Sequence, residues 1–330
     1  MRAAGITLLT AWIVLAIGAP WIAPYATDTQ FREHPFAPPT PIRVVDDEGR
    51  LRRPFIRPLR LENPLERLYV EEAGRTVPIV WFRGGRLLQP AERGVPLLLL
   101  GSDALGRDLF SRLAHAARVS LLLALLATTC AVTLGGLVGA AAGLAGGRLD
   151  SAVMRAAELA LVLPVLYVLL AFRAALPLVL PPQTTFLYML ALFAAVGWPM
   201  PARGVRAIVV AERGREYVLA AVAAGATRTR IVTRHLLPAA WSFLGTQATV
   251  LLPAFIVAEA TLSFVGLGFP DDAPSWGTLL HDTANIGMLS TAPWLLAPAA
   301  ALFTVVLGVN LTVDRTARAE AALGLAPHRA

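Results

Sequence analysis

The stretch VSLLLALLATTCAVTLGGLVGAAAGLAGG, residues 119–147, contains no charged side chain over 29 positions. A helix rises about 1.5 Å per residue and the bilayer core is about 30 Å thick, so this stretch is long enough to cross a membrane. The rest of the chain is similarly apolar: AVILMFWYC make up 56% of 330 residues, and only 15% are charged, against about 25% in soluble proteins. The sequence therefore predicts an all-α integral membrane protein.

Five further stretches with little charge predict five more spans. The first, residues 3–27, exceeds the apolar core of a secretory signal, and we expect a retained helix there rather than a cleaved leader. The others are expected from about 155 toward 181, and within 174–202, 241–268 and 283–313. The predicted fold has six transmembrane helices.

Orientation follows from the basic residues, all of which are arginine, 29 in number. Arginine on short connections marks the cytoplasmic side, and it gathers between spans two and three, between spans four and five, and after span six at Arg315 and Arg318. We therefore expect both termini in the cytoplasm. The lack of lysine excludes the G-x-x-x-x-G-K-[ST] nucleotide loop and Schiff-base catalysis. A net charge of +7 fits this orientation signal, and we expect no nucleic-acid partner.

The long connection of residues 28–118 then lies outside. Val44-Val45 and Leu51 flank a turn at residues 47–49, and residues 69–70 and 77–82 flank Ala73-Gly74, which predicts two hairpins in a small, partly β subdomain. Residues 105–117 alternate apolar and basic positions at helical spacing, which predicts a separate amphipathic helix on the outer membrane surface.

The segment 203–238 is too long for a minimal turn and too basic for lipid, yet it has helical periodicity. Gly225 is placed to end one helix and Thr227 to cap a second. The residues predict either an exposed helical hairpin that enters a groove on a partner or a solvated connecting loop.

This segment resembles the EAA loop, E-A-A-x3-G-x9-I-x-L-P, of permease subunits of binding-protein-dependent ABC importers. Further motifs are similar to the dipeptide/oligopeptide/nickel branch, especially its C-type subunit: Gly101-Ser-Asp-Ala-Leu-Gly-Arg-Asp108, residues 258–268 and residues 274–277. The loop positions that carry the resemblance are Glu216, Leu219, Ala220, Ala221, Gly225, His235, Leu237 and Pro238. Three positions depart from the pattern: Leu219 replaces the leading Glu, His235 replaces Ile, and Ser102 replaces Thr. We therefore expect Leu219 to dock apolarly, or Glu216 to substitute for the missing acid.

The resemblance covers residues 101–318, about two thirds of the chain. Together with the charge pattern, it predicts a first span at 1–27, an external loop at 28–118, a transmembrane domain at 119–318 with the coupling loop 203–238, and a cytoplasmic tail at 319–330. It implies a multi-pass protein of the cytoplasmic (inner) membrane that imports short peptides, or alternatively nickel or another small solute. The implied partners are a homologous second permease, two ATPases that use ATP, an external solute-binding protein and membrane lipid. The chain itself would bind no cofactor.

Two sets of residues within the spans are candidate functional positions. Gly135, Gly139, Gly143 and Gly147 recur every four residues, which permits close helix packing. Arg173 and Glu259 are charges at bilayer depth, and the sequence predicts either that they pair or line an outer cavity, or that each reaches the interface separately.

Enzymatic and ion-driven alternatives find little support in the residues. The five histidines form no H-E-x-x-H motif, and G-x-S-x-G is absent, so we expect no catalytic residue and no metal. A secondary transporter without ATP is the alternative from another class, and it predicts intramembrane acids and internal repeats.

Overall fold

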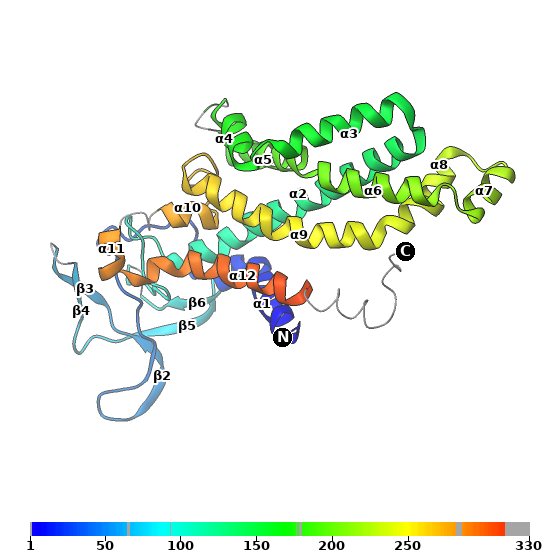
Figure 1. Ribbon diagram of the computed structural model, residues 1–330. Coiled ribbons are helices and arrows are strands. Elements are labelled where there is room, and N and C mark those ends of the chain that lie inside the picture. The colour runs from blue at the N-terminus through cyan, green and yellow to red at the C-terminus, as the bar shows by residue number, and fades with distance from the viewer. Residues whose placement is uncertain are drawn as a thin grey trace. The chain divides into compact units, whose positions relative to one another are not determined.

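The computed structural model describes residues 2–64, 67–92, 94–175, 177, 180–281 and 286–313. Predictions for Arg315, Arg318 and the tail 319–330 lie outside these residues. The chain divides into two compact units, one formed by the residues up to Leu121 together with those from Ala260 onward, and the other by residues 122–259 (Figure 1). Each unit is described by itself below.

Helices dominate the described residues. Four of them are long and apolar enough to cross a membrane, and two bent pairs bring the possible spans to six. The helices are α1 (Arg2–Ile22), α2 (Leu109–Ala145), α3 (Gly147–Val162), α4 (Val165–Ala174), α5 (Pro182–Gly197), α6 (Pro199–Glu212), α7 (Glu216–Ala223), α8 (Arg228–Ile231), α9 (Leu237–Phe264), α10 (Trp276–His281), α11 (Ile286–Thr291) and α12 (Ala297–Val313), with a π turn η1 (Val232–Leu236) and a 3-10 turn η3 (Pro293–Leu296).

Helix α2 begins ten residues before the predicted second span, and no separate helix covers residues 105–117. Asp108 starts the helix because its Oδ2 accepts a hydrogen bond from the Ser111 amide over 2.8 Å, as an N-cap residue does. Leu109, Leu113 and Ala116 are buried. The expected surface helix is therefore the first three turns of α2, packed inside the protein.

The helices over the third predicted span have other limits than expected. Helix α3 starts at Gly147, and a bend of 89° separates it from α4. Leu163, the residue before Pro164, has an extended backbone (φ −73°, ψ 130°), because a proline disfavours helix at the preceding residue. A second bend, of 42°, joins α5 to α6, and α6 takes in the first ten residues of the predicted loop 203–238.

The first unit pairs two helices from opposite ends of the chain, α1 and α12. Gly5 lies against Gly308, and Trp12 Nε1 donates to Thr304 Oγ1 over 3.0 Å. As residue numbers rise on α1 they fall on α12, so the helices are antiparallel. Glycine at both crossing positions allows the close approach.

The first unit also holds the predicted β structure. An antiparallel sheet has the order β1-β2-β5-β6 and a second sheet pairs β3 with β4. The strands are β1 (Arg43–Val45), β2 (Leu51–Ile56), β3 (Leu59–Asn63), β4 (Leu68–Glu71), β5 (Val77–Arg83) and β6 (Arg86–Pro90).

One of the two predicted hairpins is present and the other is wrong. Val45 pairs with Leu51 as expected. Residues 69–70 do not pair with 77–82: β4 pairs with β3, and β5 pairs with β2 and β6. The β5–β6 turn is Gly84-Gly85, both at positive φ (58° and 78°), which is the two-residue geometry that matches the strand twist.

Candidate functional site

The segment between α6 and α9 is a short helical hairpin at one end of the second unit (Figure 1). Gly225 ends α7 in the left-handed region at φ +79°. The Gly225 amide donates to Val222 O over 2.9 Å and the Ala226 amide to Ala221 O over 3.0 Å, which is the Schellman pattern. Thr227 Oγ1 then caps α8 by accepting from the Arg230 amide. The predicted glycine stop and threonine cap are both confirmed.

Buried side chains anchor this hairpin to the longer helices. The single buried residue of α7 is Val218, and it shares an apolar cluster with Ile231 and Leu236. The same cluster includes residues of α2, α6 and α9: Ala140, Val205, Val209 and Ala240. Val218 therefore links α7 to three longer helices through packed side chains, which deform little.

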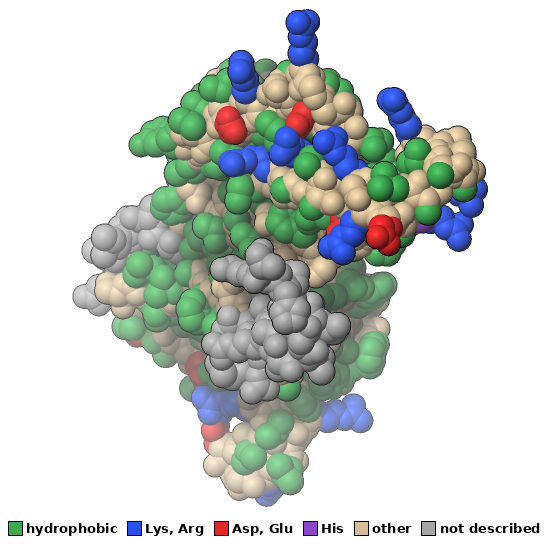
Figure 2. Space-filling model, turned by 45° about the vertical axis from the view of Figure 1, so that its right-hand side comes forward, with side chains coloured by type: hydrophobic (Ala, Val, Ile, Leu, Met, Phe, Trp, Pro, Cys, Tyr) green, Lys and Arg blue, Asp and Glu red, His purple; other side chains and the backbone are tan. Residues whose placement is uncertain are grey.

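The outer surface of the hairpin is apolar at its centre. Leu219 is 54% exposed and Val222 53%, and Ala220 is exposed while Ala221 is half-buried. Glu216, at the first turn of α7, is exposed as well. Figure 2 shows arginine side chains projecting around this end of the unit, with apolar side chains between them.

The return of the hairpin into α9 passes through a π turn. The Leu237 amide donates to Val232 O, five residues back. Pro238 follows directly, and a proline has no N–H for the carbonyl four residues earlier and crowds it. The wider π turn accommodates that ring, and such turns are frequent at functional sites. His235, within the turn, lies 5.8 Å from the Tyr217 ring.

Three polar residues that the sequence did not single out as functional brace the same end. Arg206 Nε donates to Asp150 Oδ1 over 2.9 Å, which ties α6 to α3. Arg213 Nη1 donates to the Gly143 carbonyl over 3.0 Å at the end of α2. Both arginines were counted only for orientation. Asp150 is the acid nearest the charge-free stretch 119–147, and this position could have indicated that it pairs with an arginine.

Of the four glycines predicted to permit close helix packing, three lie at a helix contact and one does not. A Cβ at Gly135 would lie 2.5 Å from Trp198 O and one at Gly143 3.0 Å from Arg206 O, while one at Gly139 would collide with Ala202 O. These three glycines let α2 approach the backbone of α6 closely. Gly147 does not belong to the row, because it starts α3 at φ +59° and has no neighbour within 4 Å of a built Cβ.

Arg173 and Glu259 are both buried in the second unit, at 3% and 0% exposure. Arg173 Nη1 donates to Pro177 O over 3.1 Å. A pairing between Arg173 and Glu259, or a shared cavity, stays a prediction.

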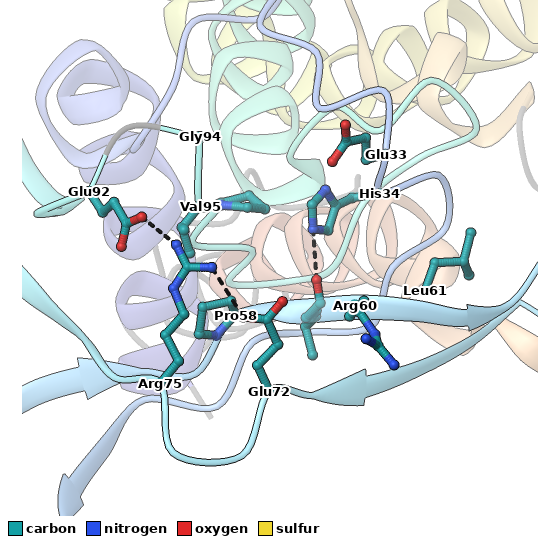
Figure 3. A pocket seen from close by; sticks show the side chains of 12 residues that line it. Glu33, His34, Pro58, Arg60, Leu61, Glu72, Arg75, Glu92, Gly94 and Val95 are labelled. Atoms are coloured by element: carbon teal, nitrogen blue, oxygen red, sulfur yellow. Dashed lines mark hydrogen bonds and ion pairs between the residues drawn. The ribbon is translucent and has the colours of Figure 1, made fainter.

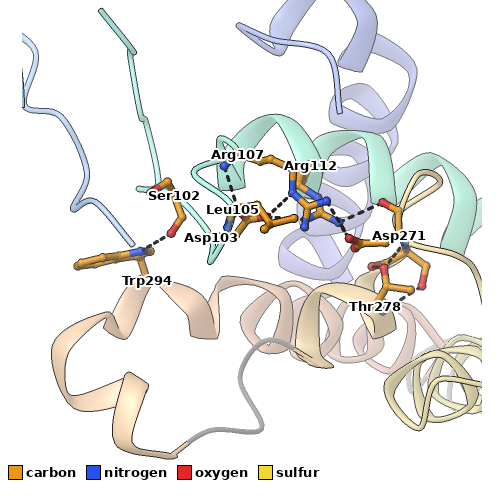
Figure 4. Close-up of polar contacts among 9 residues, drawn as sticks. Ser102, Asp103, Leu105, Arg107, Arg112, Asp271, Thr278 and Trp294 are labelled. Carbon is orange, nitrogen blue, oxygen red and sulfur yellow. Dashed lines mark hydrogen bonds and ion pairs between the residues drawn. The ribbon is translucent and has the colours of Figure 1, made fainter. Parts of the chain in front are cut away.

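In the first unit, the buried Asp103 and Arg107 of the motif at residues 101–108 form an ionic clasp with the buried Arg112 and the exposed Asp271, and we define the clasp as these four residues (Figure 4). Arg107 Nε donates to Asp103 Oδ2 over 2.6 Å, and Arg112 donates to the same oxygen. Both arginines also reach Asp271, at 2.8 and 2.7 Å. The clasp thus ties the start of α2 to the segment between α9 and α10.

The pKa values of Asp271 and of the neighbouring Asp108 shift in opposite directions. Burial opposes ionisation of Asp271, but the hydrogen bond from Arg107 and the charge of Arg112 outweigh it and hold the pKa of Asp271 below its usual range. Asp108 has no such arginine. Burial raises the pKa of Asp108 to about 7, although Ser111 donates to it.

A polar cavity of about 570 Å³ lies in the first unit, between β3 and residues 92–96 (Figure 3). Arg75 pairs with Glu72 at 3.1 Å and with Glu92, and His34 Nε2 lies 3.0 Å from Leu59 O. Because these charges are engaged with one another, they hold the segments around the cavity together.

The helices define a multi-span membrane protein with an exposed helical hairpin, and comparison with known proteins gives its family. The family described as "Binding-protein-dependent transport system inner membrane component" matches residues 131–319, more than half of the chain. The chain therefore belongs to this family of inner-membrane permease subunits.

Individual relatives extend over different parts of the chain. The di/tripeptide transport system permease protein DppC of Pseudomonas aeruginosa is 30% identical over 311 residues, 94% of this chain and 84% of the relative. The oligopeptide transport system permease protein OppC of Bacillus subtilis is 34% identical over 215 residues, 65% of this chain and 68% of the relative. A solved structure of the MetNI methionine ABC transporter in inward-facing conformations has a TM-score of 0.45 and 20% identity, with 61% of this chain and 94% of that chain covered.

Proposed function

We propose that this chain is one of two permease subunits of an ATP-driven importer of short peptides, with six spans and both termini in the cytoplasm. The four long helices and two bent pairs support six spans, and an even number places the termini on one side. The names of the relatives, a di/tripeptide and an oligopeptide permease, support peptides as the cargo. A second permease, two ATPases and a solute-binding protein complete the assembly.

The observation that carries the proposal is the α7–α8 hairpin, which is anchored inside by Val218 and exposes Leu219 and Val222 outside. A groove on an ATPase would bury these side chains, and its movement on ATP binding would pull the anchored helices. Leu219 stands where the family pattern has a Glu, so the contact here is apolar rather than charge-assisted. Glu216 is the alternative contact, one turn earlier.

The experiment is reconstitution of the complete complex in proteoliposomes with uptake of a labelled tripeptide. Leu219→Ala removes three apolar carbons, and at ~0.8 kcal/mol each this weakens ATPase docking by about 2 kcal/mol, roughly thirtyfold. Leu51→Ala, at an 84% exposed position on β2, is the matched control and should leave docking unchanged.

The two measurements test separate points: uptake tests whether the chain is part of an ATP-driven importer, and docking tests which residue contacts the ATPase. Uptake that proceeds without ATP or partners would refute the importer and favour a secondary transporter. ATP-dependent uptake with undiminished docking of Leu219→Ala, but weakened docking of Glu216→Gln, would instead move the contact to Glu216.

A further inference from the structure

The β5–β6 hairpin ends in an exposed tip of aromatic and basic residues. Trp81 is 53% exposed and Phe82 76%, and Arg83 is exposed beside them. The two-residue Gly84-Gly85 turn holds the tip tightly. Adjacent exposed aromatic rings beside arginines are the composition of segments that lie in a membrane interface.

The hairpin is attached where α1 ends. Strand β6 packs against α1, and Gln89 Nε2 donates to the Pro24 carbonyl over 3.3 Å, two residues beyond the helix. Trp21, in the last turn of α1, is 60% exposed, as expected of a tryptophan at the level of the lipid headgroups. The hairpin therefore starts at the membrane boundary.

A basic group lies beside the tip. Arg86 is the first residue of β6, directly after the Gly84-Gly85 turn, and the charges of Arg86 and Arg118 both act on His115 of α2. Among the described residues, no ion pair engages Arg86 or Arg118, and Arg86 Nη1 has no hydrogen-bond acceptor. A buried donor without an acceptor is costly, and Arg86 is only partly buried. Nη1 itself is enclosed, so it is the rest of the Arg86 guanidinium that can take an anionic oxygen from outside the protein.

Beyond Arg118, α2 has an exposed apolar stripe. Leu122 and Leu125, one and two turns beyond Arg118, are 51% and 55% exposed. An arginine above an apolar stripe can lay its stem along the acyl chains and hold its head at the phosphates.

We propose that Arg86 and Arg118 bind the phosphate of an anionic phospholipid, while Trp81 and Phe82 insert into the same interface beside α1. The hairpin is then a membrane anchor of the external subdomain. The proposed topology enters only in the choice of leaflet, which is the outer one. The site needs no ATP and no transported solute, so its test is independent of the proposed function.

The first measurement is the depth of the tip in the membrane. The exposed Cys130 is replaced by alanine, Phe82→Cys is labelled with a fluorophore, and the full complex is placed in nanodiscs with lipids brominated on their acyl chains. We expect severalfold quenching at position 82. A label at Leu51→Cys, at the exposed start of β2, should stay bright. Equal brightness at both positions, or a change at 82 only on addition of the solute-binding protein, would overturn the anchor and identify a protein-docking tip.

The second measurement is lipid retention, followed by native mass spectrometry of the detergent-purified complex with added phosphatidylglycerol. Arg86→Gln with Arg118→Gln should retain severalfold less of this lipid than the parent. Arg53→Gln with Arg60→Gln removes the same charge from exposed positions of the same subdomain and should retain as much as the parent. Equal retention in the two double variants, or full displacement of the lipid by millimolar inorganic phosphate, would contradict a lipid site.

Discussion

Replacement of Gly225 by valine tests whether the α7–α8 hairpin depends on the left-handed backbone at this position, because the substitution causes no steric clash. Gly225 has φ +79°, and no atom lies within 4 Å of a Cβ built there. The whole cost of the substitution is therefore conformational: a left-handed L-residue costs about 1–2 kcal/mol, and a β-branched residue lies at or above the upper end of that range. The population of the capped hairpin, relative to other conformations of this segment, should fall by a factor of about 5–30 or more.

The assay is the number of tripeptides imported per ATP hydrolysed by the reconstituted complex. Gly225→Val should lower this ratio severalfold while ATP hydrolysis continues. Gly225→Asn should keep most of it, because asparagine tolerates the left-handed region. Gly214→Val is the matched control, since Gly214 also has open space around it but no positive φ. An unchanged ratio for Gly225→Val, or equal losses for valine and asparagine, would refute the backbone argument.

Three further predictions concern stability, each measured by unfolding of the purified protein in detergent. Asp103→Asn should lower the free energy of unfolding by about 3–5 kcal/mol, because it leaves buried arginines without a carboxylate, and Asp271→Asn by less, since that side chain is 62% exposed; equal losses would contradict the clasp. Burial raises the pKa of Asp108 from 3.8 in the unfolded chain to about 7 in the folded protein, so stability should fall as pH rises from about 4 to 7, and Asp108→Asn should flatten that slope. Gly139→Ala should cost about 1–3 kcal/mol by overpacking against α6, whereas Gly245→Ala, with open space around it, should not destabilise; similar effects of the two would argue against close packing.

Stretches without charge located the long apolar helices but misplaced their ends. The rule treats every arginine as a boundary, yet α2 starts before Arg112, whose charge is neutralised by Asp103 and Asp271. Asp271 is 159 residues away in the sequence, so no local pattern could reveal the pair. The break at Pro164, in contrast, is a local effect that the sequence contained.

The β subdomain shows the same division between local and distant information. The Val45–Leu51 pairing was predictable because a turn of fixed length joins the strands. Strand β5 was assigned the wrong neighbour because β2, more than twenty residues earlier, competes for it. The sequence also contains Gly84-Gly85, which is a stronger hairpin signal and forms the β5–β6 turn.

The shape of the α7–α8 hairpin was predictable because the helix stop at Gly225 and the helix cap at Thr227 each act over a few residues. Its anchoring was not, since the cluster around Val218 draws residues from three other helices. This difference bears on mechanism. In the proposed importer, the caps would set the form of the surface that the ATPase binds, whereas the cluster would determine whether movement of that surface reaches the longer helices. A substitution at Leu219 should therefore weaken the grip alone, while Val218→Ala should leave docking intact and reduce the transport gained per ATP.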